Sequence, residues 1–466
     1  MRRWIGLSLL TVSMLATNAC RTTDAASNKL QPCEIALAEH DGNSKLDDEI
    51  RAIQKKVRAQ QGSQQALPTI EKLGWSYVEK ARASFDPGFY KLAEQCATCL
   101  ELKSAQLAKA KPANSANSAN SANSANSANS ESQSFAPMSP QSSQASALLL
   151  RGHVLHSLHR FAEAEQIARQ LTMSRGLAFD FGLLGDVLME QGRLDEAIAA
   201  YQKMMELKPS PQAYSRAAHV RWLKGDLAGA RVLMRMSAQA SGNGDAEASA
   251  WAWSKLALYE LQAGELKQAM ATCELALELQ PGYAPALLAK GRVLLAENKF
   301  SEAVMSLERA ADKNPLPEYR WTLAEALRTA GRTNEAQKVE AGLMANGEKD
   351  DPRTFAVYLA TRGEQTATAL KLTEEELKQR RDVFTLDALA WAQSAAGNHQ
   401  QAWQTMQQAL TVGTADARLF LHAAVIAAKS NQLTEARQFA KRASAIQSTL
   451  LPSERERLNQ LGQLKP

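Results

Sequence analysis

Apolar positions recur along this chain with a period of 33 or 34 residues. In the clearest copy, Phe181, Leu184 and Leu188 fall at helical spacing and form one apolar stripe. A short polar stretch follows, and a second stripe runs from Leu194 to Pro209, which ends the helix. The pattern predicts a helix–turn–helix hairpin. Its repetition predicts a stack of such hairpins, because a period of this length is typical of solenoids.

Two positions of the unit stay small in almost every copy, and we expect them where the paired helices come closest. With units beginning near Ala145, Ala178, Pro211, Ala250, Ala284, Pro317, Lys349, Val383 and Ala417, they are positions 8 and 20. Position 8 holds Gly152, Gly185, Ala218, Ala257, Gly291, Ala324, Ala356, Ala390 and Ala424. Position 20 holds Ala164, Ala197, Ala230, Ala269, Ala303, Ala336, Thr368, Ala402 and Ala436. Thr368 departs from this rule, so the second helix of its unit is the least supported.

With a proline at position 32, as at Pro209 and Pro315, the unit resembles the tetratricopeptide repeat (TPR). The resemblance covers nine units over residues 145–448. It implies an all-α fold, a TPR α-solenoid in which the hairpins stack into a right-handed superhelix.

The flanks of the nine units also carry helical patterns. Residues 67–106 predict an earlier hairpin with longer arms, because Gly74 and Ala93 are 19 residues apart, against 12 between Gly185 and Ala197. An amphipathic helix in the segment 20–58 predicts an N-terminal cap, and residues 451–466 predict a C-terminal capping helix. Open ends of a solenoid would otherwise expose an apolar face.

Residues 107–147 have a different composition. Ala-Asn-Ser occurs six times in succession from Ala113 to Ser130, and a stretch rich in serine and glutamine follows. Almost nothing in it can be buried, so it predicts a disordered loop.

The first residues have the pattern of an export signal, predicted over residues 1–19. Arg2 and Arg3 precede an apolar run that is too short to span a bilayer, and small residues then lead to Cys20. This end resembles a bacterial lipoprotein signal, although Thr17 stands where an aliphatic residue is usual. The resemblance implies lipidation of Cys20 and an outer-membrane anchor. The alternative is ordinary cleavage after Ala19, which would release a periplasmic or secreted protein.

Charge and cysteine content narrow the function classes. The net charge is +5 over 466 residues without a dominant basic cluster, so we expect no nucleic-acid partner. In an oxidising compartment Cys33 could form a disulfide with Cys96 or Cys99 and tie the N-terminal cap to the first hairpin. The alternative is that these thiols are buried and inert, as we expect for Cys273.

No catalytic or metal-binding pattern stands out. His153, His156 and His159 are three apart, but the outer two are about 240° apart around a straight helix and cannot converge on one ion. Nucleophile elbows, phosphate-binding glycine loops and zinc-protease motifs are absent from the sequence. We therefore predict neither cofactor nor enzyme activity. The alternative from another class is a metal-binding or redox envelope enzyme that uses His153–His159 and Cys96–Cys99.

In TPR proteins the first helix of each unit lines the concave wall, with positions 2, 5, 9 and 12 pointing inward. Mixed tryptophan, arginine and histidine there are typical of a recognition surface. For Trp251 and Trp321 the alternative is packing between neighbouring units. The resemblance thus implies a scaffold for an unidentified protein or peptide at the cell envelope, or an accessory factor of a secretion, pilus or envelope-assembly machine. The implied partner-binding residues are His153, His156, Asp186, His219, Trp222, Trp251, Arg292, Trp321, Glu325, Arg328, Arg353, Asp387, Trp391 and Arg418.

Overall fold

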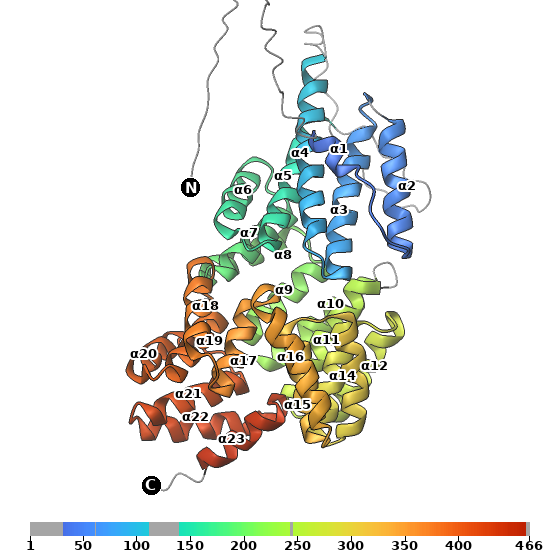
Figure 1. Cartoon of the computed structure of the whole chain (residues 1–466). Coiled ribbons are helices and arrows are strands. Elements are labelled where there is room, and N and C mark those ends of the chain that lie inside the picture. The colour runs from blue at the N-terminus through green and yellow to red at the C-terminus, as the bar shows by residue number, and fades with distance from the viewer. Residues whose placement is uncertain (1–30, 61, 111–138, 243–245, 463–466) are drawn as a thin grey trace, which may run out of the picture.

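The structure is a computed structural model, and it describes residues 31–60, 62–110, 139–242 and 246–462. These residues form helices α1 to α23 and no strand (Figure 1), which confirms the all-α solenoid. The predicted signal and Cys20 lie outside the described residues.

Eighteen helices, α5 to α22, pair into nine consecutive hairpins. Their bounds are α5 Pro140–Ser157 with α6 Phe161–Ser174, α7 Ala178–Glu190 with α8 Leu194–Leu207, α9 Pro211–Leu223 with α10 Leu227–Ser241, α11 Ala246–Gln262 with α12 Leu266–Leu279, α13 Ala284–Ala296 with α14 Phe300–Lys313, α15 Pro317–Thr329 with α16 Thr333–Asp350, α17 Pro352–Arg362 with α18 Thr366–Gln379, α19 Val383–Ala395 with α20 His399–Leu410, and α21 Ala417–Lys429 with α22 Leu433–Ala445.

The same backbone device separates the two helices of every hairpin. Each turn has a residue with a positive φ that ends the first helix and lets the chain reverse, and the turn before α18 has a second one, Gln365. Glycine takes this conformation without steric cost, while histidine and asparagine carry it in three of the turns. The nine residues are His159, Gly192, Gly225, Gly264, Asn298, Gly331, Gly363, Gly397 and Asn431.

Small residues at position 8 permit close helix contact. A Cβ added to Gly185 would lie 2.3 Å from Cε1 of Tyr201 in the second helix of its hairpin. In the one irregular unit, Ala369 is fully buried while Thr368 is half-buried. The second helix of that unit is therefore present as α18, with its small position one residue later than the sequence register predicted. Counted from position 8, the first helix of that unit is one residue longer than in α7: α17 ends six residues after Ala356, whereas α7 ends five residues after Gly185. This additional residue causes the shift.

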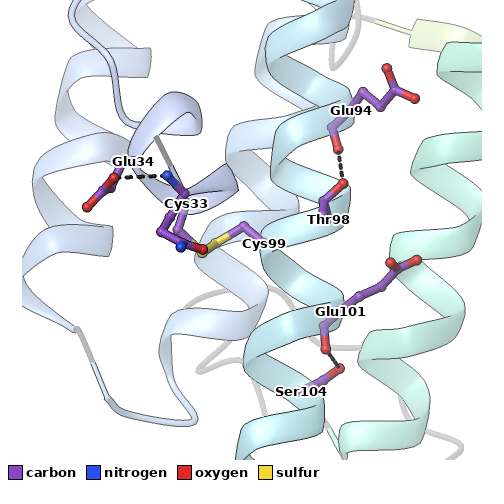
Figure 2. Close-up of a disulfide and its surroundings, with 8 residues drawn as sticks. Cys33, Glu34, Glu94, Thr98, Cys99, Glu101 and Ser104 are labelled. Atoms are coloured by element: carbon purple, nitrogen blue, oxygen red, sulfur yellow. Dashed lines mark hydrogen bonds between the residues drawn. A yellow bond between two sulfur atoms is a disulfide. The ribbon is translucent and has the colours of Figure 1, made fainter. Parts of the chain in front are cut away.

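The N-terminal part comprises α1 (Pro32–Ala36), α2 (Lys45–Ala59) and the long hairpin of α3 (Ala66–Ser84) and α4 (Gly88–Ala110). A disulfide joins Cys33 of α1 to Cys99 of α4 (Figure 2). Tyr77, which is fully buried in α3, donates its hydroxyl hydrogen to the carbonyl of Ala36 at 2.9 Å. These two links fix the short α1 against the first hairpin, and Cys96 is a free, buried thiol.

The boundaries predicted for a disordered loop, 107–147, are too wide. Helix α4 continues to Ala110, and α5 begins at Pro140. Proline suits the first turn of a helix, and the hydroxyl of Ser139 accepts a hydrogen bond from the backbone N–H of Ser142 at 3.1 Å. Ala147 then packs in the core of the first hairpin. The residues between these helices, 111–138, lie outside the described part.

The superhelix closes on itself, so that C-terminal units contact units in the middle of the chain (Figure 1). The backbone N–H of Arg381 donates to the carbonyl oxygen of Glu190 at 3.0 Å. The hydroxyl of Thr414 donates to the carbonyl oxygen of Leu223 at 2.9 Å. The linkers that precede α19 and α21 therefore rest on the turns of the α7–α8 and α9–α10 hairpins.

The C-terminal segment contains the predicted helix, α23 (Pro452–Gly462), which packs on α21 and α22 of the last hairpin as a cap would. It also contacts α15, and the short 3₁₀ helix η2 (Gln447–Thr449) before it contacts α11 and α13. Beyond capping the last hairpin, the chain therefore crosses the inner face of the closed superhelix, where Leu450, Leu451 and Leu458 are buried.

Candidate functional site

The concave wall predicted to bind a partner is the side lined by the first helices of the hairpins, α5, α7, α9 and so on to α21, and we call it the inner face. The structure divides it into two sectors. The C-terminal sector, from α13 to α21, is largely covered by the chain's own η2 and α23. In the N-terminal sector, from α5 to α11, η2 contacts α11, but Trp251 of that helix and Phe179 of α7 stay exposed.

Helix α23 is held in the C-terminal sector by polar contacts along its length. Glu454 is 3% exposed and forms an ion pair with Arg418. The hydroxyl of Ser453 donates to Glu325 at 2.7 Å, and Arg455 donates to the carbonyl oxygen of Leu295 at 2.9 Å. Burial alone would raise the pKa of Glu454, but Arg418 outweighs it and the net pKa is lowered. Glu454 is therefore a buried carboxylate with a matched partner.

The tryptophans of this sector are core residues, which corrects the predicted partner surface. Trp321 is 3% exposed and lies beneath Arg418, whose guanidinium carbon is 4.8 Å from the ring centroid. Trp391 is also 3% exposed and stacks on His422 with 4.1 Å between ring centroids. Asp387 is buried against His422, with Oδ1 2.9 Å from Nδ1. None of these three residues is accessible to a protein partner, because α23 and neighbouring units cover them, although Trp391 also lines a cavity between α17, α19, α21 and α23.

Other predicted residues are engaged within the fold. Arg328 and Glu340 form an ion pair across one hairpin, and Arg292 pairs with Glu318 at 3.1 Å. Arg353 lies 3.2 Å from Asp382. These arginines bridge adjacent helices, and each remains partly accessible to water.

Trp222 belongs to the closure of the superhelix. Its ring stacks on Phe384 of α19 with 5.7 Å between centroids, and its indole N–H donates to Gln262 at 2.7 Å. His219 also stacks on Trp222, with 5.7 Å between ring centroids. We therefore assign Trp222 to intramolecular packing, in place of the partner anchor predicted from its position in the unit.

The N-terminal sector keeps large side chains in contact with water. Trp251 is 37% exposed, and Nζ of Lys255 lies 5.9 Å from its ring centroid. Phe179 is 45% exposed. Phe179 is not among the partner-binding residues predicted from the sequence, although its place at position 2, which points inward, is a signal that identifies it. Two exposed aromatic rings at inward position 2, with a lysine beside one of them, make this sector the better candidate for partner contact.

The polar groups of this sector are desolvated by the helices around them. Burial lowers the pKa of His153 and of His219 to about 4 each, so both are neutral at physiological pH. Burial also lowers the pKa of Lys255. Asp186 is paired with Arg216, and Oδ1 of Asp186 accepts from the Tyr201 hydroxyl at 2.8 Å. A partner entering here would meet neutral imidazoles, an internally paired aspartate and one lysine.

The histidines of α5 and the following turn each contact an aromatic ring. His153 faces Trp75 at 5.4 Å between ring centroids, His156 meets Phe161 edge-on at 5.6 Å, and His159 stacks on the same Phe161. No group of three or more histidine, cysteine or acidic side chains within the described ranges is placed to hold a metal ion. Burial raises the pKa of the Cys96 thiol, which disfavours the reactive thiolate.

Comparisons with known proteins agree with the repeat geometry. One tetratricopeptide repeat family model matches residues 178–211, and another matches residues 260–320. The chain contains tetratricopeptide repeats. The fold is a TPR α-solenoid, which indicates a protein–protein interaction scaffold. A search of curated proteins found no match. None of the helices described here combines the length and apolarity needed to cross a membrane.

The solved structures that this chain resembles are distant in sequence. A tetratricopeptide repeat protein from Parabacteroides merdae is 14% identical, with a TM-score of 0.31, and covers 55% of this chain and 100% of its own. Yeast Tom70 is 12% identical, with a TM-score of 0.36, and covers 89% and 95%. A human IFIT1 dimer with PPP-AAAA is 11% identical, with a TM-score of 0.43, and covers 89% and 94%. At such identities the likeness concerns the fold alone.

Proposed function

We propose that this protein is a non-catalytic scaffold of the bacterial cell envelope that binds another protein on the N-terminal sector of its inner face. We choose this sector because its aromatic side chains are exposed. Phe179 and Trp251 stay exposed there, whereas Trp321 and Trp391 in the C-terminal sector are covered by the chain itself. Exposed aromatic rings at inward positions are the residues that most often anchor a protein interface.

The side chains of this sector suggest which chemical groups the partner segment carries. Lys255 makes no ion pair within 4.0 Å among the described residues, although Glu318 exerts a longer-range attraction on it. A segment with an apolar side chain for the aromatic rings and a carboxylate for Lys255 would fit both features. An extended peptide or a helix could present such a pair.

Site-specific photocrosslinking in the native host tests the binding surface. A photoreactive residue at position 251 should give a discrete adduct with an envelope protein. The matched control is position 305, because Met305 is 63% exposed on the outer helix α14. Phe179→Ala in the chain that carries the crosslinker should reduce the adduct at 251 without changing the helical circular dichroism signal. Equal adducts at 251 and 305, or none at 251, would contradict the proposal.

The envelope address rests on the sequence pattern around Cys20 and is tested separately. Cell fractionation should find the protein with membranes and find Cys20→Ser in the soluble periplasmic fraction. If both forms fractionate alike, the protein is not anchored through this cysteine, whatever the outcome of the crosslinking.

A further inference from the structure

A cavity of about 480 Å³ lies between α17, α19, α21 and α23. It is the part of the C-terminal sector that α23 leaves open, and it lies away from the exposed rings Phe179 and Trp251. Its volume falls within the range of pockets that hold small organic ligands, about 300–1,000 Å³.

The walls of the cavity combine apolar and cationic groups. Trp391, Val425 and Leu461 supply apolar surface, helped by two alanines of α17 and α19. Lys429 and Arg457 supply positive charge, and the described residues that line the cavity include no carboxylate. Such a combination selects a ligand that has both an anionic group and an apolar body.

Neither cation forms an ion pair within 4.0 Å among the described residues, although Glu454 and Glu325 attract Arg457 at longer range. Arg457 donates one N–H from Nη2 to the carbonyl oxygen of Thr361 at 2.8 Å and lies 5.4 Å from the Trp391 ring centroid, which leaves its other N–H groups available. Burial lowers the pKa of Lys429, and the charge of Arg457 lowers it further. An anion between the two would relieve this repulsion.

Arg362, the third basic residue on the rim, is different. It is bound to Glu364 at 2.8 Å and to Glu340 at 3.2 Å. The charge available to a ligand therefore comes from Lys429 on α21 and Arg457 on α23, which approach the cavity from two separate elements.

A third polar group is left unsatisfied in the same wall. Ser394 is 1% exposed, and its hydroxyl oxygen is buried without a hydrogen-bond partner. Buried hydroxyls are almost always hydrogen-bonded, and leaving one unpaired costs roughly 1–3 kcal/mol. Ser394 lines the cavity but its hydroxyl oxygen is itself buried, so a ligand oxygen accepts this hydrogen bond once the Ser394 side chain rotates toward the cavity.

We propose that this cavity binds an organic anion with a small apolar body. Its carboxylate or phosphate is held by Lys429, Arg457 and the Ser394 hydroxyl, and its apolar part lies against Trp391 and Val425. This site is separate from the surface proposed for a protein partner, so either proposal can fail without the other.

Isothermal titration calorimetry with matched probes tests the site. N-acetyl-leucine should bind the full chain, and its neutral amide should bind at least tenfold more weakly, because the two differ in the carboxylate. Isobutyl phosphate and inorganic phosphate are two further probes in the same titration experiment. Preference for isobutyl phosphate over N-acetyl-leucine would identify a phosphate headgroup, and tighter binding than inorganic phosphate would show that the apolar wall contributes.

Three variants connect the binding to these residues. Lys429→Met should weaken the tighter-binding organic probe about tenfold, as expected for loss of a charged hydrogen-bond donor. Ser394→Ala should also weaken it while leaving the unfolding midpoint unchanged or higher, since it removes an unpaired hydroxyl. Lys441→Met, on the outer helix α22, should have no effect. Equal binding of N-acetyl-leucine and its amide together with no binding of isobutyl phosphate, or unchanged affinity in Lys429→Met, would overturn the proposal.

Discussion

Position 8 of the repeat shows how one residue controls the distance between two helices. In the α7–α8 hairpin this position is Gly185, and the ring of Tyr201 occupies the space that any side chain would need. In other hairpins the position is alanine, as at Ala218 and Ala257, which are fully buried. Whether alanine is tolerated thus depends on the residue opposite.

We expect Gly185→Ala to lower the free energy of unfolding by about 1–3 kcal/mol, because the added Cβ would meet Tyr201 at 2.3 Å. Gly342→Ala is the matched control. Gly342 is also helical, but the nearest atoms to an added Cβ belong to the Arg320 side chain at 4.0 Å, so better helix propensity should raise stability by up to ~1 kcal/mol. Urea unfolding followed by circular dichroism measures both. A stabilising effect of Gly185→Ala would show that the helix pair can move apart freely.

The short C-terminal helix shows where local pattern stops predicting structure. Its apolar and capping residues are visible in the sequence, and an element at 452–462 could be predicted from them. The place where this helix packs could not be predicted, because its partners are distant in sequence. Glu325 lies 128 residues from Ser453, and Arg418 lies 36 residues from Glu454. For the same reason, the sequence predicts Trp391 as an inward-facing anchor for a partner, and only the position of α23 shows that it is covered.

Glu454 is the residue of α23 whose loss should matter most. Glu454→Ala leaves Arg418 without its carboxylate, and we expect a loss of ~2 kcal/mol in unfolding free energy, limited by the partial exposure of Arg418. Glu456→Ala, at an exposed position of the same helix, should change little. Because the folded pKa of Glu454 lies below 4.5, its contribution is present above pH 4.5 and is lost as pH falls through the folded value. Equal stability of both variants at pH 7 would contradict the role given to this pair.

The repeat register predicts each hairpin, because helix packing within a hairpin is set by residues close in sequence. The course of the superhelix follows from small rotations that accumulate over many hairpins. The contacts of Glu190 with Arg381 and of Leu223 with Thr414 depend on these accumulated rotations. No local sequence pattern indicates them. The repeat register therefore gives the position of each residue within its unit, while the openness of the inner face could not be predicted from it.

Closure of the superhelix can be tested at one turn. A Cβ added to Gly192 would lie 2.4 Å from the carbonyl oxygen of Arg381, on the opposite side of the contact. Gly264 has the same place in its own turn and a similar φ, +77° against +75°, but has nothing within 4 Å. Alanine at either position carries the same left-handed backbone cost of roughly 1–2 kcal/mol, so the difference between the two variants isolates the contact. We expect Gly192→Ala to increase the radius of gyration measured by small-angle X-ray scattering and to be the less stable of the two. If both variants keep the wild-type scattering profile and lose equal stability, the contact between the α7–α8 turn and the linker before α19 does not hold the superhelix closed.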